Sequence, residues 1–240
     1  MIGGGVHNQI AGTWSDDTSM LLATCDSIRV KRGRIDVNDM RKRFCDWAYK
    51  GKYSPDGICF DIGTATSTAL FEGVGGKSEK SNGNGSLMRI APLAFTNATD
   101  EQVACVSAIT HAHRISIDAC TAYVHIMRAL AEGISPGKAI KTHSPTEPPF
   151  ERLMLISELD IDEIESSGYV VHTLEAALWC LLHTRTYTDC VTAAVNLGRD
   201  SDTTACVAGA LAGVLYGIDA IPTEWIECLR AKDVIEKCLF

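Results

Sequence analysis

Apolar residues recur at helical spacing along most of this chain, and polar residues mark where helices begin and end. The pattern predicts amphipathic helices, because a helix buries one stripe of side chains and Ser, Asp or Asn commonly precedes its first turn. The short apolar runs at 58–62 and 170–171 have no alternating partners, so strands are not indicated. We therefore expect an all-α fold. The expected helices cover residues 16–28, 36–47, 64–71, 100–132 with a break at 111–114, 173–182, 188–197 and 203–216.

Two polar stretches interrupt the helical pattern. Residues 77–85 are rich in glycine and polar side chains and predict a loop, and residues 135–149 are rich in proline and predict a linker or surface excursion. In the last expected helix, small residues recur at every fourth position. This strip predicts that another helix packs closely against it; its members are Ala205, Gly209, Gly213 and Gly217.

The composition indicates one sizeable domain without a nucleic-acid or membrane signature. The 240 residues are 46% hydrophobic, and we expect residues 1–240 to form a single domain. The net charge is −8 and the basic residues are scattered apart from a run at 29–34, so the concentrated basic face of a nucleic-acid binder is lacking. The longest apolar run, 205–215, is shorter than the roughly 20 residues that cross a bilayer.

Ten cysteines are spread along the chain, and no two of them have the C-x-x-C spacing of a zinc ribbon or a redox motif. Several fall within apolar helical patterns, where a free thiol behaves as a small hydrophobe. With no signal peptide at the start, we expect reduced cysteines and a cytoplasmic location, although the even count leaves disulfides open.

Two acidic clusters stand at the heads of expected helices, near opposite ends of the chain. Either cluster alone is explained by helix capping, because Asp and Ser interact well with the N-terminal helix dipole. Two clusters of similar chemistry favour a shared site for hard divalent cations, which prefer oxygen ligands and relieve the repulsion among four aspartates. The candidate ligands are Ser15, Asp16, Asp17, Asp200, Asp202 and Thr203.

Three further features carry candidate chemistry. The glycine-rich segment 81–89 offers backbone N–H groups to an anion, although a plain turn explains it equally well and no Walker sequence follows. His111 and His113 lie two residues apart without other zinc ligands nearby, which favours a pocket-lining or core role over metal binding. Tyr169 follows Gly168, and its ring either projects into a cleft or packs as an ordinary aromatic.

Five segments, taken in this order, resemble the motifs of the ADP-ribosylglycohydrolase family. They are residues 12–20, 82–93, 110–113, 167–177 and 194–203, and the last is the most specific. The resemblance implies an orthogonal helical bundle with a central two-metal cleft, usually holding two Mg²⁺ or Mn²⁺ ions. It also implies hydrolysis of the glycosidic bond at C1″ of ADP-ribose, with an ADP-ribosylated protein or a small ADP-ribose derivative as the substrate.

The resemblance also implies residue roles. The six candidate ligands would hold the two cations from opposite sides of the cleft. His111 and Tyr169 would contact the ribose or adenosine parts of the substrate, and we hypothesise that Asp16 or Asp17 accepts the proton of the attacking water. The residues that would hold the diphosphate are Gly83, Asn84, Gly85 and Ser86.

Three departures from the family pattern stand out. Ser15 occupies a position where the family often has Thr, which keeps the hydroxyl ligand. Arg199 precedes Asp200, and a cation at this position could pair with an aspartate of the metal site and weaken metal binding. The family normally carries a segment of roughly fifty residues before this point, so we expect the domain to lack it.

Other interpretations stay open. A catalytically impaired ADP-ribose-binding module and a structural relative would each be compatible with a missing first segment, although intact aspartates argue against a purely structural role. A prenyl-transfer enzyme would need a third Asp at the position of Met20. We expect no nucleic-acid or membrane partner and a monomer, with an oligomer left open.

Overall fold

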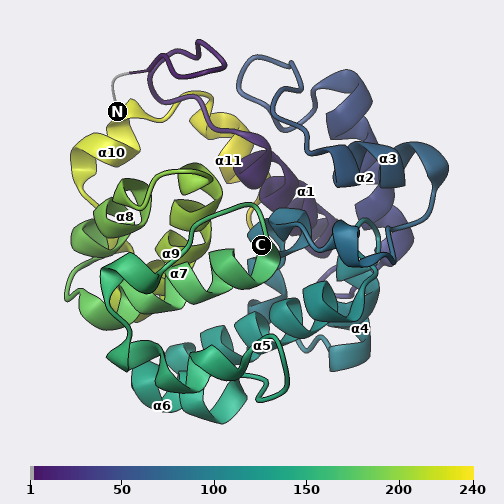
Figure 1. Ribbon diagram of the computed structural model, residues 1–240. Coiled ribbons are helices and arrows are strands. Elements are labelled where there is room, and N and C mark those ends of the chain that lie inside the picture. The colour runs from purple at the N-terminus through teal and green to yellow at the C-terminus, as the bar shows by residue number, and fades with distance from the viewer. Residues whose placement is uncertain (1–2) are drawn as a thin grey trace.

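The computed structural model describes residues 3–240, and these form a bundle of helices that run in several directions (Figure 1). The described residues contain no β-sheet, only isolated bridges, so the expected all-α fold is confirmed. The α-helices are α1 (Asp16–Val30), α2 (Val37–Lys50), α3 (Thr64–Glu72), α4 (Asp100–Ser107), α5 (Arg114–Ala131), α6 (Pro136–His143), α7 (Val170–His183), α8 (Tyr187–Asn196), α9 (Ser201–Tyr216), α10 (Thr223–Cys228) and α11 (Lys232–Cys238). The short 3-10 helices are η1 (Glu79–Ser81), η2 (Asn84–Arg89), η3 (Ala91–Phe95), η4 (Glu151–Glu158), η5 (Ile161–Glu163) and η6 (Ile218–Ala220).

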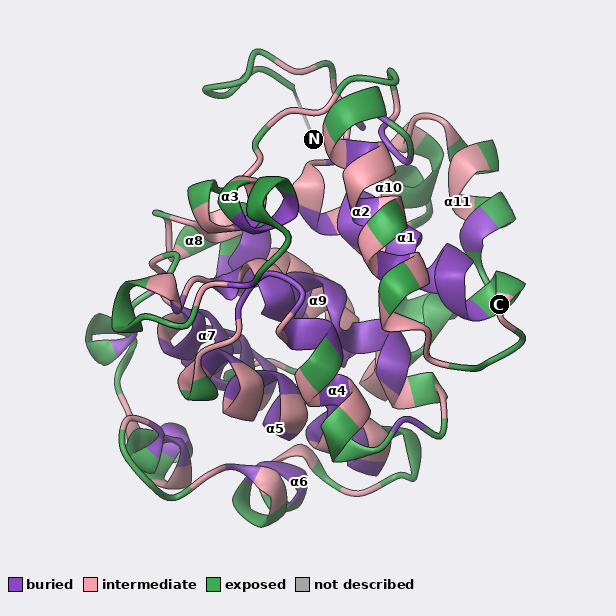
Figure 2. Ribbon diagram, turned by 90° about the vertical axis from the view of Figure 1, so that its right-hand side faces the viewer, coloured by how far each residue is buried: buried purple, intermediate pink, exposed green. Residues whose placement is uncertain are grey.

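Helix α7 is the most deeply buried element, and α5, α8 and α9 pack against it (Figure 2). Its side chains Leu174, Ala177 and Leu178 have no exposed surface. Burying a large aliphatic side chain contributes roughly 1.5–3 kcal/mol to stability, so this helix is firmly placed. Because α7 begins directly after Tyr169, its burial also fixes the preceding segment, which borders the site described below.

Residues 135–149 contain α6, so the expectation of a linker is wrong for the first half of this segment. Pro136 stands in the first turn of the helix, where the missing N–H group has no partner to lose. Ala139 and Ile140 are buried in the core. The prolines that suggested a linker therefore mark the beginning of a helix and the turn after it.

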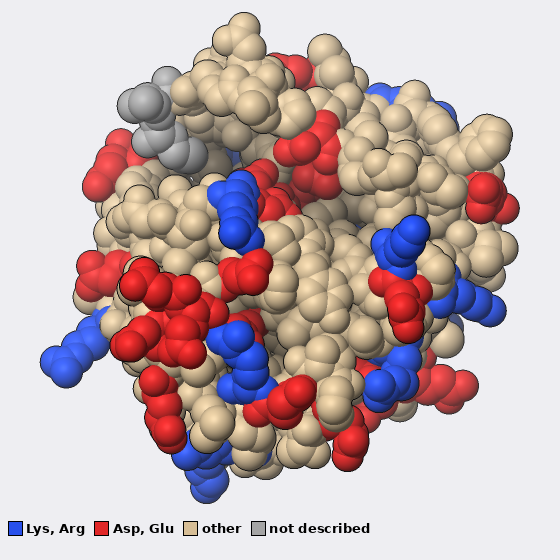
Figure 3. All heavy atoms as spheres, viewed as in Figure 1, with Lys and Arg blue, Asp and Glu red and all other residues tan. Residues whose placement is uncertain are grey.

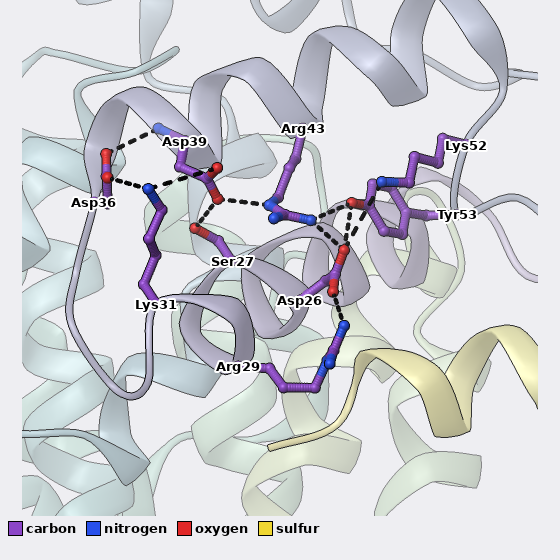
Figure 4. Close-up of polar contacts among 9 residues, drawn as sticks. All are labelled: Asp26, Ser27, Arg29, Lys31, Asp36, Asp39, Arg43, Lys52 and Tyr53. Carbon is purple, nitrogen blue, oxygen red and sulfur yellow. Dashed lines mark hydrogen bonds and ion pairs between the residues drawn. The ribbon is translucent and has the colours of Figure 1, made fainter.

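An ion-pair network joins α1 to α2 and to the loop that follows α2 (Figure 4). Arg43 of α2 pairs with Asp26 of α1, and its Nε donates to Asp39 Oδ2 at 2.6 Å. The Tyr53 hydroxyl donates to Asp26 Oδ2 at 2.8 Å and accepts from Arg43 at 2.9 Å. Side chains of this network are largely buried, so the loop after α2 is fixed relative to α1.

Helices α8 and α9 approach each other closely at the strip of small residues. A β-carbon built on Gly209 would lie 3.4 Å from Cγ2 of Val191 and 3.5 Å from the hydroxyl of Tyr187, both in α8. The expected close approach is confirmed at this position. Gly217, the last member of the strip, instead follows the end of α9 with a φ of 80°.

Two findings concern the cysteines and the membrane. All ten cysteines are free thiols in this structure. Over residues 3–240, the helices are either too short or too polar to cross a lipid bilayer.

Candidate active site

The two acidic clusters come together at one cleft, although they lie near opposite ends of the sequence. The beginnings of α1 and α9 face each other, and the cavity between them has a volume of about 270 Å³. In the space-filling view, acidic side chains lie beside a hollow near the centre of the visible face (Figure 3). The cleft is lined by Asp16, Asp61, Gly63, Thr64, Ala65, Thr66, Gly83, Asn84, Gly85, Met88, His111, Gly168, Asp200, Asp202 and Thr203.

Asp16 and Asp17 differ in what surrounds them. Asp16 lines the cleft, and burial together with the charges of Asp17 and Asp61 raises the pKa of Asp16 to about 9. Asp17 is 2% exposed; burial and the charge of Asp202 raise its pKa to about 7. The Ser15 hydroxyl donates to Asp17 Oδ2 at 2.8 Å, whereas Asp17 Oδ1 is buried without any hydrogen-bond partner. Ser15 thus precedes α1 as expected but supports Asp17 instead of capping the helix.

Asp200 is held by a side chain from the glycine-rich segment. Asn84 Nδ2 donates to Asp200 Oδ2 at 2.7 Å and to Thr173 Oγ1 at 2.9 Å. Burial raises the pKa of Asp200 despite this hydrogen bond, which acts to lower it. Asp200, not Asp202, is the residue that precedes α9, so Asp202 and Thr203 lie within its first turn.

Carboxylates alone do not complete a metal site here. Among the described residues, no three His, Cys, Asp or Glu side chains are placed so that they could hold an ion by themselves. The cleft adds the Thr203 hydroxyl to Asp16, Asp200 and Asp202. Any ion in this cleft would therefore need hydroxyl or water oxygens as well.

The glycine-rich segment packs directly against His111. A β-carbon on Gly85 would lie 2.9 Å from both His111 Cε1 and Thr66 Oγ1, and one on Gly83 would lie 3.3 Å from His111 Nε2. Only glycine fits this close approach at Gly85 without a shift of its neighbours. The backbone N–H of Asn84 already donates to Gly168 O at 3.0 Å, so that group is not free to bind an anion.

His111 is buried, and its surroundings fix its tautomer. Burial and the neighbouring Arg89 lower the pKa of His111 to about 3, so the ring is neutral at physiological pH. Arg89 donates to Thr110 Oγ1 at 2.7 Å, which leaves the Thr110 hydroxyl hydrogen for His111 Nδ1 at 2.8 Å. We therefore assign the ring proton to Nε2, and the His111 side chain lines the cleft.

Two predicted substrate-binding residues do not line the cleft. Ser86 has no exposed surface, and its hydroxyl accepts from Ser107 Oγ at 3.0 Å. Tyr169 is half-buried, and its ring packs edge-on against His172 with the centroids 5.0 Å apart. The neighbouring Gly168 lines the cleft instead, where a β-carbon would lie 3.3 Å from Asp200 Oδ2. His113 caps α5 through a bond from the Ile115 N–H.

Asp61 is a cleft residue that the sequence interpretation missed. It lies in the loop before α3 with a φ of 58°, and its charge helps to raise the pKa of Asp16. His7 Nε2 lies 3.0 Å from Asp61 Oδ1. The available signal was a single acid within the apolar run 58–62, two positions before Gly63.

Arg199 does not pair with an aspartate of the cleft, so that expectation is wrong. Its guanidinium donates to Glu165 Oε2 at 2.7 Å on the surface. Arg199 has a φ of 53°, a left-handed conformation, and it lies directly before Asp200, the residue that precedes α9. The charge that was expected to weaken the site is thus neutralised outside it.

Comparisons with known proteins identify the family. A family model for ADP-ribosylglycohydrolase matches residues 1–239. ADP-ribosylarginine hydrolase Tri1 of Pseudomonas putida (strain GB-1) is 35% identical over 254 aligned positions, covering 99% of this chain and 68% of that protein. ADP-ribosyl-[dinitrogen reductase] glycohydrolase of Rhodospirillum rubrum is 32% identical, covering 97% and 79%. A solved structure titled as an ADP-ribosylglycohydrolase-related protein complex superposes with a TM-score of 0.80 at 31% identity, covering 99% and 84%. The chain belongs to the ADP-ribosylglycohydrolase family.

Proposed function

We propose that this protein hydrolyses the glycosidic bond between ADP-ribose and an acceptor, with an ADP-ribosylated arginine side chain as the first substrate to test. The observation that carries the proposal is the convergence of Asp16, Asp200 and Asp202 at one cleft that also contains the glycine-rich segment, with Asp17 buried beside them. The arginine acceptor follows from the names of two relatives that are each 35% identical, from Pseudomonas putida and Serratia proteamaculans. Serine and other acceptors are the alternatives that the assay separates.

Divalent cations fit the chemistry of this cleft. Asp17 Oδ1 is buried without a partner, and burial and neighbouring charges raise the pKa of Asp16. A cation bound beside these carboxylates would supply the missing partner and stabilise their charged forms. We propose two ions, Mg²⁺ or Mn²⁺, with hydroxyl ligands completing the set. The proposed ligands are Ser15, Asp16, Asp17, Asp200, Asp202 and Thr203. Ions bound there would neutralise the carboxylates and orient the ribose hydroxyls.

Side chains of the cleft have three further roles in the proposed reaction. Asp16, which lines the cleft, or Asp17 behind it would accept a proton from the attacking water once bound cations hold it in the charged carboxylate form. Asn84 holds Asp200 in place through its 2.7 Å hydrogen bond. His111 presents Nε2–H as a neutral donor toward Gly83, where a ribose or phosphate oxygen of the substrate would accept it.

Turnover of defined substrates tests the proposal. Purified protein is incubated with ADP-ribosyl-arginine and with an ADP-ribosyl-serine peptide, with Mg²⁺, with Mn²⁺ or with EDTA, and free ADP-ribose is measured by chromatography. We expect release from ADP-ribosyl-arginine that needs the cation and is lost in Asp202→Ala. The matched control is Asp162→Ala, which removes an exposed aspartate of η5. No release with any acceptor, or equal release by Asp202→Ala, contradicts the proposal.

Three coarser features belong to the same proposal. We propose that residues 1–240 act as one catalytic domain and that the protein works as a monomer. The ten free thiols support a reducing compartment such as the cytoplasm.

A further inference from the structure

Arg230, between α10 and α11, contacts two segments that are far apart in the sequence. Its Nη1 donates to Thr13 Oγ1 at 3.0 Å and to Asp56 Oδ2 at 2.6 Å. Its Nη2 donates to Asp56 Oδ1, also at 2.6 Å, which completes a two-pronged ion pair. In Figure 1 the C-terminal helices lie beside the N-terminal segment and α1, which agrees with these contacts.

Both contacted residues stand just before acids of the cleft. Thr13 lies three positions before Asp16, and Asp56 lies five positions before Asp61 in the loop between α2 and α3. Asp16 and Asp61 both line the cleft, and their charges interact. One guanidinium therefore joins the two chain segments that bring these carboxylates into one cavity.

The backbone around Arg230 is fitted to the first of these segments. The Arg230 N–H donates to Gly12 O at 3.1 Å. A β-carbon on Gly12 would lie 1.9 Å from Cys228 O, and Gly12 has a φ of 83°, so both space and conformation require glycine there. The close contact between residues 228–230 and Gly12 places the guanidinium next to Thr13.

A second contact joins the same two segments closer to the core. Trp14 Nε1 donates to Tyr53 O at 3.0 Å, and both side chains are buried. Arg230 and Asp56 are more exposed, at 29% and 41%, and exposed ion pairs contribute little to stability. Two contacts between the segments restrict their relative position more than one contact does. We therefore expect the Arg230 contact to affect the position of the segments more than the stability of the protein.

We propose that Arg230 is a positioning residue, which sets the relative position of Asp16 and Asp61 in the cleft through Thr13 and Asp56. This proposal rests on the proposed hydrolase activity. Arginine is required because its planar fork contacts both oxygens of Asp56 and the Thr13 hydroxyl together, which the single ammonium of lysine does not reproduce. Misplacing a reacting group by about 1 Å can cost roughly a hundredfold in rate, so a surface contact of this kind can affect turnover.

The test compares steady-state kinetics and thermal midpoints for Arg230→Lys, Asp56→Asn and the double variant. We expect kcat to fall about tenfold or more in each single variant, with little change in KM or in the thermal midpoint. The double variant should be no slower than the worse single variant, because both changes remove one contact. The matched control is Lys237→Ala, which removes an exposed ion pair with Asp233 at 2.9 Å in the same C-terminal region. It should leave kcat unchanged.

Two results overturn the positioning role. If the variants lower the thermal midpoint while kcat per folded molecule is unchanged, Arg230 serves stability only. If the losses in kcat multiply in the double variant, the two residues do not act through one contact. Absence of turnover in the unaltered protein would instead reject the hydrolase proposal, so the two failures are distinguishable.

Discussion

Asn84 and Asp200 are joined by a 2.7 Å hydrogen bond from the Asn84 amide to Oδ2 of the carboxylate, although 116 positions separate them in the sequence. The glycine-rich segment is thereby fixed to the beginning of α9, which contributes half of the acidic cleft. The segment that resembles the family's diphosphate-binding loop therefore also has a structural role, because its Asn84 orients the Asp200 carboxylate.

Replacing Asn84 by Ala should weaken both stability and cation binding. The half-buried Asp200 carboxylate would lose its amide donor, and the loss of a partner for a fully buried group costs about 1–3 kcal/mol, which sets the upper limit here. Mn²⁺ titration by calorimetry should show a weaker dissociation constant, and thermal denaturation a lower midpoint. Asn97→Ala, at an exposed asparagine, is the control. Unchanged Mn²⁺ affinity in Asn84→Ala would show that Asp200 needs no such support.

The protein without cations should become less stable as the pH rises. The pKa of Asp16 is raised to about 9 in the folded state, against 3.8 as its ordinary value, so the folded state holds a proton that the unfolded state has released. The free energy of unfolding then falls with rising pH between these two values, by up to about 1.4 kcal/mol per pH unit for one proton.

Urea denaturation in EDTA between about pH 7 and pH 8.5 measures this effect, since that window lies above the ordinary pKa of His and at or below that of Cys. Asp16→Asn should flatten the curve, because its side chain does not titrate, and Mg²⁺ should reverse the loss in the unaltered protein. A stability that rises with pH over this window would contradict the charge arrangement of the cleft.

Much of this arrangement was predictable, because it depends on local signals. The heads of α1 and α9 show as polar residues before apolar periodicity, and their likeness in chemistry indicated a shared site. The sequence could not show that Ser86 and Tyr169 lie outside the lining of the cleft, because their orientation depends on Ser107 and His172, which no local pattern connects to them.

Asp61 was missed for a related reason. It is a single acid in an irregular loop, and only its left-handed conformation and the packing of the loop after α2 turn it toward Asp16. Helix α6 was missed because proline is usually a helix breaker, whereas Pro136 occupies the first turn that tolerates it. For Asp61 and Pro136, the position of the residue in the fold determines its role, and residue type alone does not reveal that position.

His111 should stay neutral with its proton on Nε2. Its lowered pKa of about 3 and the Arg89–Thr110–His111 chain of hydrogen bonds both favour this form. Long-range ¹H–¹⁵N NMR spectra should show an Nε2–H tautomer that does not titrate between about pH 5 and pH 8. Titration of His111 near its ordinary pKa would contradict this assignment.

Gly85→Ala should damage the cleft more than the fold. The added carbon would lie 2.9 Å from His111 and Thr66, so one of these side chains has to move. Overpacking of this kind costs about 1–3 kcal/mol, and turnover should fall more than tenfold because both displaced groups line the cleft. Gly137→Ala is the matched control in α6, where the new carbon meets only Leu182 at 4.0 Å. Equal turnover by the two variants would show that the fit at Gly85 is not needed.

The most direct test of the account is a crystal soaked in Mn²⁺ and measured at a wavelength where manganese scatters anomalously. We expect anomalous density between the beginnings of α1 and α9, within coordination distance of Asp16 or Asp17 on one side and of Asp200, Asp202 or Thr203 on the other. Density elsewhere on the protein, or none in this cleft at saturating Mn²⁺, would contradict a shared cation site built from the two acidic clusters.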